Sequence, residues 1–240
     1  MAIAPVRIKS ICDHAQKARD REQILTLQLT SDVLKLRENE EKPTTPYNAS
    51  RSLADFLDGT GQDEDARMYA MEQTTLALNI ASSMLQFRPT VWCKVPWNNN
   101  SIKFPTRIVQ DSHLPVCAPY VEQDVDVKLL QNHTYPSELN TTEAKKTMLE
   151  LAILLLEVMH HKSIEAWAAK SQEGTAQTYQ DRMRVATRWL EQSTGKLLPD
   201  HLQAIEECLV LCARSKISWD DKFQRGYCEN IIKPLQKLVS

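Results

Sequence analysis

Hydrophobic residues recur with two different periods at the start of the chain. Ile8, Ile11, Ala15 and Ala18 stand at helical spacing, which predicts one amphipathic helix over residues 6–20. Over residues 25–36, leucines alternate with polar residues, and the turn-forming segment Thr30-Ser-Asp interrupts the alternation. Alternation with a central turn is typical of a β-hairpin. We therefore predict a helix followed by a hairpin.

Helical periodicity dominates after a charged, proline-containing linker at about residues 39–49. A short helix carries Leu53, Phe56 and Leu57, with Ser50 or Ser52 as its cap, and stops at Asp58-Gly59. A long helix is predicted over residues 64–87, ended by Pro89. The face that this helix is predicted to bury consists of Met68, Met71, Thr75, Leu78, Ala81 and Leu85.

Prolines make residues 88–140 an irregular span, with a short strand predicted at Ile102–Phe104. Helical patterns then return near residues 142–161, 175–193, 200–214 and 219–238. In the third of these helices, the side chains predicted to face inward are Cys208, Leu209, Leu211 and Cys212. The predicted fold class is mainly α, with a minor β component (α+β).

Composition excludes several classes of partner. The chain has 240 residues, of which 42% are hydrophobic, enough for a real core. Its formal charge is −2 and it has no dense Lys/Arg tract, so we expect neither a nucleic acid nor a membrane as partner. The most apolar segment, Met148 to Met159, contains Glu150 and Glu157 and is too short to span a bilayer.

The six cysteines are scattered without a CxxC pair, and the first ten residues lack the apolar run of a secretory signal. We therefore expect reduced thiols and an intracellular, cytoplasmic location.

The order of elements resembles a protein kinase that lacks its first strands. More narrowly, the chain is similar to an uncharacterised fungal family of kinase-like domains that are often attached to prion-inhibition (HeLo-type) helical domains. The matching residues are Ala81 to Gln86, Thr90 to Trp92, Trp97, Ile102, Phe104, Pro119 to Val121, Leu151 to Glu157, Trp189, Cys208, Leu209, Trp219, Phe223, Tyr227, Pro234 and Leu235. Departures from the family pattern are Phe87-Arg88 and Ala152.

The resemblance implies a degenerate protein-kinase-like fold in two parts. Residues 1–46 would form a truncated N-lobe, made of the helix and the hairpin, and residues 47–240 a helical C-lobe. The segment Phe87 to Phe104 would stand where a kinase has its catalytic loop.

Phosphoryl transfer needs parts that this sequence lacks. The only close glycine pair, Gly59 and Gly61, follows the linker instead of opening a sheet, and no strand is predicted before the first helix to carry a lysine for the phosphates. Residues 91–110 contain no Asp or Glu to act as the base, and an amide such as Asn98, Asn99 or Asn100 cannot replace it. We expect no kinase-type catalytic residues, no cofactor and no metal.

Four residues of the family motif are candidates for an interface: Trp92, Trp97, Asn100 and Tyr120. For the two tryptophans, packing between the long helix and the buried helix is the favoured interpretation, because an aromatic side chain contributes a large apolar area. The alternative is an exposed aromatic patch for a protein partner, since tryptophan is enriched at interface hot spots.

Two other constellations have weak support. His201, Cys208 and Cys212 share one helical face and could offer three zinc ligands, but structural zinc usually takes four, so core cysteines beside a surface histidine are favoured. Cys93 could act as a nucleophile with His113 or His133, although nothing distinguishes it from a packed thiol.

The sequence therefore favours a non-catalytic, pseudokinase-like interaction or signalling module with an unidentified protein partner. The alternative is an accessory enzyme of a non-kinase class, for example a biosynthetic one, that uses the cleft between the lobes.

Overall fold

The computed structural model divides the chain into two compact units, Met1–Tyr47 and Asn48–Ser240. The residues whose structure is described are 6–7, 26–30, 33–37, 48–57, 68–87, 95–106, 119–122 and 141–239. The division between the units falls inside the segment predicted as a linker.

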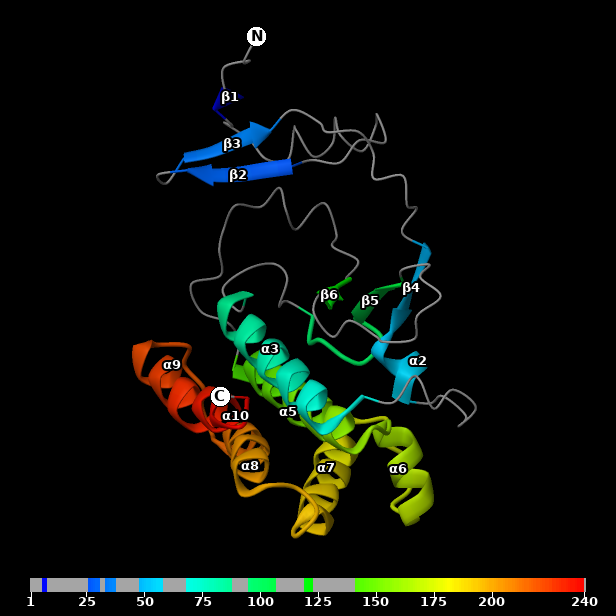
Figure 1. Ribbon diagram of the computed structural model, residues 1–240. Coiled ribbons are helices and arrows are strands. Elements are labelled where there is room, and N and C mark those ends of the chain that lie inside the picture. Colours follow the sequence, from blue (N-terminus) through cyan, green and yellow to red (C-terminus); the bar gives the residue numbers. More distant parts are fainter. Residues whose placement is uncertain are drawn as a thin grey trace. The chain divides into compact units, whose positions relative to one another are not determined.

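The first unit contains a three-stranded antiparallel sheet (Figure 1). Its strands are β1 (Val6–Arg7), β2 (Thr26–Thr30) and β3 (Val33–Arg37), in the order β1-β3-β2. The predicted hairpin is confirmed, since β2 and β3 pair with Leu27 opposite Leu36 and Leu29 opposite Leu34.

The helix predicted over residues 6–20 is wrong at its start. Val6 and Arg7 pair with Leu36 and Lys35 of β3, so the backbone there satisfies its hydrogen bonds across a sheet. Helical spacing of apolar residues could not reveal this, because strand pairing depends on a partner some thirty residues away. Residues 8–20 lie outside the described part of the chain.

A second antiparallel sheet opens the larger unit. Its strands are β4 (Asn48–Ser52), β5 (Ile102–Thr106) and β6 (Tyr120–Val121), in the order β4-β5-β6. The strand predicted at residues 102–104 is confirmed as part of β5. Helix α2 (Leu53–Leu57) follows β4 directly, and Ser52 caps it, as predicted. The Ser52 hydroxyl accepts a bond from the Asp55 amide, while the Asp55 carboxylate accepts one from the Ser52 amide.

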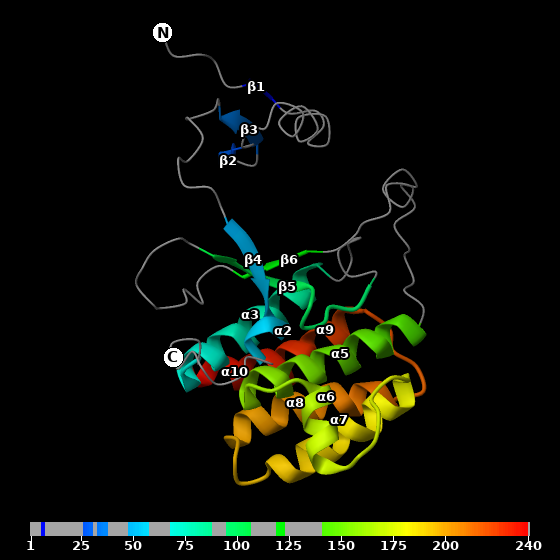
Figure 2. The same ribbon diagram turned by 90° about the vertical axis from the view of Figure 1, so that its right-hand side faces the viewer.

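The remaining described elements of the larger unit are helices, which confirms a mainly α fold. Its helices are α3 (Ala70–Phe87), α5 (Thr141–His160), α6 (Ile164–Ser171), α7 (Tyr179–Ser193), α8 (Pro199–Ala213), α9 (Asp221–Tyr227), the π-helical η3 (Cys228–Ile232) and α10 (Lys233–Lys237). Figure 2 shows the second sheet on one side of α3 and α5, and α6, α7 and α8 on the other. None of the helices in the described ranges is long and apolar enough to cross a membrane.

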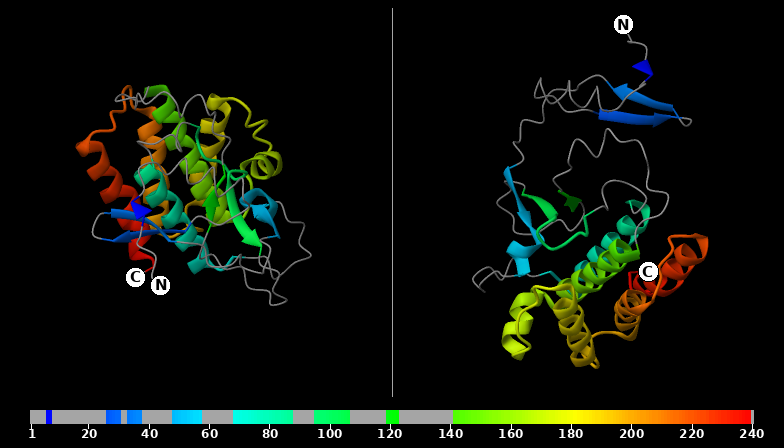
Figure 3. Two further views of the ribbon diagram at one scale, coloured as in Figure 1. Left: turned by 90° about the horizontal axis from the view of Figure 1, so that it is seen from above. Right: turned by 180° about the vertical axis from the view of Figure 1, so that it is seen from behind.

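Helix α5 is the centre of the larger unit. Seen from behind in Figure 3, it crosses this unit between α3 and the helices α7 and α8. Nearly every side chain from Thr147 to Met159 is buried, including that of Glu157. Such a helix, apolar around its whole circumference, requires neighbours on all sides.

The buried face of α3 agrees only in part with the predicted one. Met68 and Ala81 are buried as predicted, whereas Met71 is 58% exposed. The residues buried within α3 are Thr74, Leu76, Ala77, Ile80, Ala81 and Met84. Thr74 can be buried because its hydroxyl donates to the Ala70 carbonyl and lies 3.1 Å from Nε2 of His201 in α8. Since α3 carries apolar residues around much of its surface, tertiary packing selects which stripe faces inward.

A stack of aromatic rings joins α5, α6 and α7. Trp189 lies between Trp167 and His160, with ring centroids 5.3 Å away on each side. His160 Nε2 lies 2.7 Å from the Ser193 hydroxyl, which donates to the Trp189 carbonyl. Burial, with Lys196 and Lys162 nearby, lowers the pKa of His160 to about 4, so the ring in this stack is neutral at pH 7. Helix α6 was not predicted as a separate element.

The C-terminal helices return to α3 through a buried tyrosine. Tyr227 is 1% exposed, and its hydroxyl donates a 2.9 Å hydrogen bond to the Ala81 carbonyl. Its ring also lies near those of Trp219 and Phe223. The predicted single helix over residues 219–238 is continuous in direction but contains the π-helical segment η3.

We expect Tyr227→Phe to lower the free energy of unfolding by about 1 kcal/mol, because it removes one buried hydrogen bond and keeps the ring. Chemical denaturation followed by circular dichroism measures this change. Tyr120→Phe is the matched control, since Tyr120 is 43% exposed, and should change the free energy by less than about 0.5 kcal/mol. Equal effects of the two substitutions would contradict this role for Tyr227.

Candidate functional site

The candidate site surrounds an asparagine-rich turn between α3 and β5. Within residues 98–101, the Asn98 side-chain oxygen accepts bonds from the amides of Asn100 and Ser101, at 2.9 and 3.1 Å. The Ser101 hydroxyl in turn accepts from the Asn98 amide and donates to the Asn98 carbonyl. Such side-chain bonds to nearby backbone define an Asx-type turn. Asn98 and Ser101 therefore hold the turn.

Asn99 connects the turn to two other parts of the unit. Its carbonyl accepts a 3.0 Å bond from the amide of Ala54 in α2, and its side-chain amide donates a 3.0 Å bond to Oε1 of Glu157 in α5. The same Glu157 oxygen accepts the amide of Ile164, the first residue of α6, at 2.9 Å. Glu157 therefore links the asparagine turn to the start of α6.

Glu157 is the most perturbed carboxyl group in the described part of the chain. Its side chain is buried, with only 1% of the residue exposed, and this burial raises its pKa to about 8. The Ile164 amide acts in the opposite direction, while Glu165 and Glu150 add to the rise. At pH 7 the carboxyl is therefore mainly protonated and neutral, the form that a buried site favours.

A cavity of about 400 Å³ opens beside this link. It is lined by the turn on one side and by charged side chains of the helices on the other, among them Lys146, Glu150 and Arg182. Arg182 makes a bidentate pair with Glu150, at 2.8 and 2.7 Å, and reaches Glu165 at 3.1 Å. Arg182 is therefore already matched by carboxylates, and the two cations of the lining stand against Glu150 and Glu165, so the cavity lacks the excess positive charge expected of a phosphate site.

The four candidate interface residues have different positions. Trp97 is 1% exposed and its ring lies 6.3 Å from that of Phe87, so it packs in the core and is not available to a partner in this conformation. Tyr120 is partly exposed and lines, with Trp97, a second cavity of about 300 Å³ between α3 and the sheet. Asn100 is exposed at the first cavity. Trp92 lies outside the described residues.

Asn100 differs from its two neighbours in the turn. Among the described residues, its side chain has no hydrogen bond, whereas those of Asn98 and Asn99 are both engaged. The structure therefore leaves Asn100 as the asparagine whose amide can contact a ligand or a partner at this cavity.

Sequence reasoning missed Glu157 as part of a site. Its presence in the apolar run from Met148 to Met159 was a signal, because a buried carboxyl needs hydrogen-bond donors. One of these donors is the first amide of α6, so Glu157 helps to cap that helix. Its second donor, Asn99, is 58 residues away in sequence.

The possible zinc ligands form no metal site. His201 is 7% exposed, which corrects the expectation of a surface histidine: it is buried because its ring bonds to Thr74. Burial raises the pKa of Cys212 to about 12 and that of Cys208 well above its usual value, so both thiols are protonated at pH 7, as expected of core cysteines. Within the described ranges, no group of three or more His, Cys, Asp or Glu side chains could hold a metal. Cys93, His113 and His133 lie outside those ranges.

The raised pKa of Glu157 predicts a pH-dependent difference between the protein and its Glu157→Gln variant. The folded state holds the proton more tightly than the unfolded chain, where the ordinary pKa is 4.5. The contribution of Glu157 to stability is therefore complete below pH 4.5 and is lost as pH rises toward 8. Across that window, the free energy of unfolding should fall relative to the variant by up to about 5 kcal/mol.

Denaturant titrations of both proteins at several pH values measure this difference. Glutamine keeps an oxygen that can accept from Asn99 and Ile164, and His160 and His201 are unchanged in the variant, so their titrations cancel. A difference that does not vary between pH 4.5 and 8 would show that the Glu157 pKa is not raised.

The comparisons with known proteins give one match. No curated protein and no solved structure matches the chain. One family model, described as "Domain of unknown function (DUF7580)", matches residues 2–240. Because this match covers nearly the whole sequence, the chain belongs to the DUF7580 family.

Proposed function

We propose that this protein is a non-catalytic, kinase-like interaction or signalling module. The order of elements in the larger unit supports the kinase-like part. Helix α3, the asparagine turn, strand β5 and the deeply buried helix α5 follow one another as the resemblance to degenerate kinases implies. Strand β4 and helix α2 precede this series, and strand β6 lies between β5 and α5 in the chain.

The side-chain hydrogen bonds of the asparagine turn support a non-catalytic function, and they are the observation on which the proposal rests. A kinase needs an aspartate at this loop to accept the proton of the substrate hydroxyl. Here the side chains of Asn98, Asn99 and Ser101 are engaged in holding the loop itself. The carboxyl that the loop reaches, Glu157, is 1% exposed and bonded to two N–H donors, so its hydrogen bonds serve the structure even though it borders the cavity.

The charge of the cavity agrees with this interpretation. The lining has two cations, Lys146 and Arg182, and two carboxylates, Glu150 and Glu165, so a triphosphate with its Mg²⁺ would meet balanced charge instead of a cationic cradle. What the turn offers to solvent is the amide of Asn100 and the apolar surface of Val95, which is 58% exposed. Neutral, donor-and-acceptor surfaces of this kind suit contacts with another protein.

The alternative of an accessory enzyme has one observation in its favour. A carboxyl group with a pKa near 8 that borders a cavity has the properties of a general acid. This cavity lies entirely within the larger unit, so such an enzyme would not need the cleft between lobes. The two hydrogen bonds that Glu157 accepts give it a structural role first.

A transfer assay tests the proposal. We expect the purified chain, incubated with radiolabelled ATP, Mg²⁺ and casein, to transfer no more phosphate than a heat-denatured sample. Thermal unfolding with millimolar ATP and Mg²⁺ should show no stabilisation, whereas a ligand at about 100 times its dissociation constant would add roughly 2.7 kcal/mol.

Transfer that Asn100→Ala abolishes would contradict the proposal, provided that the melting temperature stays unchanged. Asn79→Ala is the matched control, because Asn79 is also an exposed asparagine but lies on α3 beside the other cavity.

A further inference from the structure

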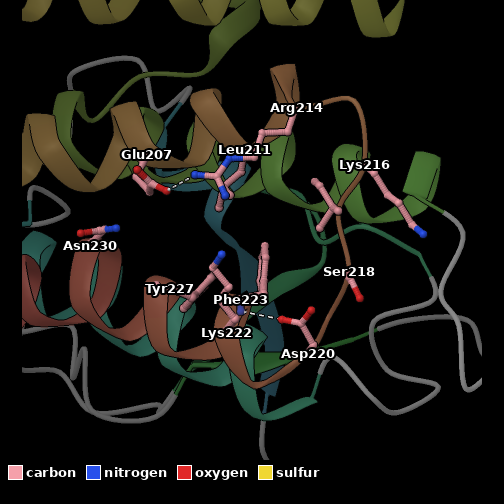
Figure 4. Close-up of a pocket in the computed structure, with 12 residues that line it drawn as sticks. Glu207, Leu211, Arg214, Lys216, Ser218, Asp220, Lys222, Phe223, Tyr227 and Asn230 are labelled. Atoms are coloured by element: carbon pink, nitrogen blue, oxygen red, sulfur yellow. Dashed lines mark hydrogen bonds and ion pairs between the residues drawn. The ribbon is translucent and has the colours of Figure 1, made fainter.

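A groove separates the C-terminal half of α8 from α9 and η3, on elements that the asparagine turn does not use. Its volume is about 400 Å³. Figure 4 shows the two helical segments facing each other with side chains of both between them, while Lys216 and Ser218 lie on the segment that joins them. Helix α8 contributes Glu207 and Leu211, its C-cap residue Arg214 follows them, and the opposite wall carries Phe223, Tyr227 and Asn230.

The floor of the groove is apolar and rigid. Leu211 and Ile217 are nearly buried, and the ring of Phe223 lies 4.4 Å from that of Trp219 and 6.2 Å from that of Tyr227. Tyr227 is also fixed by its hydrogen bond to the Ala81 carbonyl. A floor of ordered aromatic and aliphatic side chains can receive an apolar side chain without losing much conformational entropy.

The groove is bordered by five charged side chains, and two of them are lysines that form no ion pair with another described residue. Arg214 turns toward Glu207 and pairs with it at 3.2 Å, and the Asp220 carboxylate accepts the Phe223 amide at 2.8 Å (Figure 4). Lys216 and Lys222 are exposed, and neither has an ion pair with another described residue. With three basic and two acidic lining residues, the groove has an excess of positive charge in a chain whose net charge is −2.

Gly226 is a separate observation that points to an occupant. It lies inside helix α9, where its backbone does not adopt a positive φ, and a Cβ atom placed on it would meet nothing within 4 Å. Glycine in a helix is less stable than alanine, so neither backbone geometry nor packing accounts for it here. Gly226 is one of the residues that line the groove. Because glycine has no side chain, the groove stays open at this position.

The π-helical segment begins two residues later. Asn230, in η3, lines the groove, and π-helical segments occur frequently at functional sites because they displace side chains from the regular helical spacing.

We propose that this groove binds a short acidic segment of a partner protein, with an apolar or aromatic side chain on the Phe223–Tyr227 floor and flanking carboxylates on Lys216 and Lys222. This inference rests on the proposed interaction function and names the chemistry of its partner. Charge complementarity selects the acidic segment, and the open space beside Gly226 admits its apolar side chain.

A displayed library of random seven-residue peptides tests the inference with the full chain as bait. Enriched peptides should carry Asp or Glu next to Phe, Trp, Leu or Ile. Fluorescence anisotropy of a labelled, enriched peptide should then show affinity that falls as salt rises, because the contacts with the lysines are exposed ion pairs.

Two variants locate the site. Gly226→Leu should weaken binding by about tenfold or more by filling the groove, and Lys216→Glu with Lys222→Glu should weaken it by about tenfold through charge repulsion. The charge-matched control is Lys170→Glu with Lys196→Glu, exposed lysines outside the groove, and should keep the affinity. Gly226→Ala should keep or raise the melting temperature, which shows that a glycine is not needed for folding.

The inference is overturned if no peptide is enriched, if the enriched peptides are neutral or basic, or if Gly226→Leu binds them as well as the original chain does. None of these results bears on phosphate transfer, so a failure here leaves the non-catalytic proposal intact. Conversely, transfer that depends on Asn100 would remove that proposal without affecting this groove.

Discussion

The larger unit depends on the burial of α5, a helix with almost no solvent-exposed side chain in its second half. A helix of this kind gains stability only when neighbours cover it on every side, so α3, α6, α7 and α8 are all arranged around it. Its central position also means that any polar group that it carries must be satisfied by those neighbours. Glu157 is such a group, and its two donors come from the asparagine turn and from the first residue of α6.

This requirement explains what the polar side chains of the asparagine turn do. They close the turn and supply a hydrogen-bond donor to a buried carboxyl, both of which are structural tasks. Because the Glu157 carboxyl is buried and accepts hydrogen bonds from two amides, this conformation holds it in place. The surfaces of the unit are therefore the next places to look for a binding site.

Those surfaces differ in character. In the cavity beside the turn, Arg182 is already paired with carboxylates. The groove between α8 and α9 instead combines an apolar floor, two lysines without an ion pair to another described residue, and a glycine that no local constraint requires. The second arrangement is the one that suits recognition, because an incoming acidic segment would gain both apolar burial and charge pairing there. The two sites lie on different elements of the same helical unit, so one can be altered without the other.

The sequence by itself determined the elements whose signals are local. The alternating leucines specified the hairpin of β2 and β3, Ser52 specified the cap of α2, and the apolar run specified α5 as a buried helix, because each signal lies within the element itself. It also determined that the loop lacks an acid. What only the tertiary structure decided depends on partners distant in sequence. The pairing of β1 with β3, the inward stripe of α3, the burial of His201 beside Thr74 and the link from Asn99 to Glu157 all join residues that no local pattern connects. The groove beside Gly226 belongs to this second group, since a glycine signals an open space only when the facing helix is known.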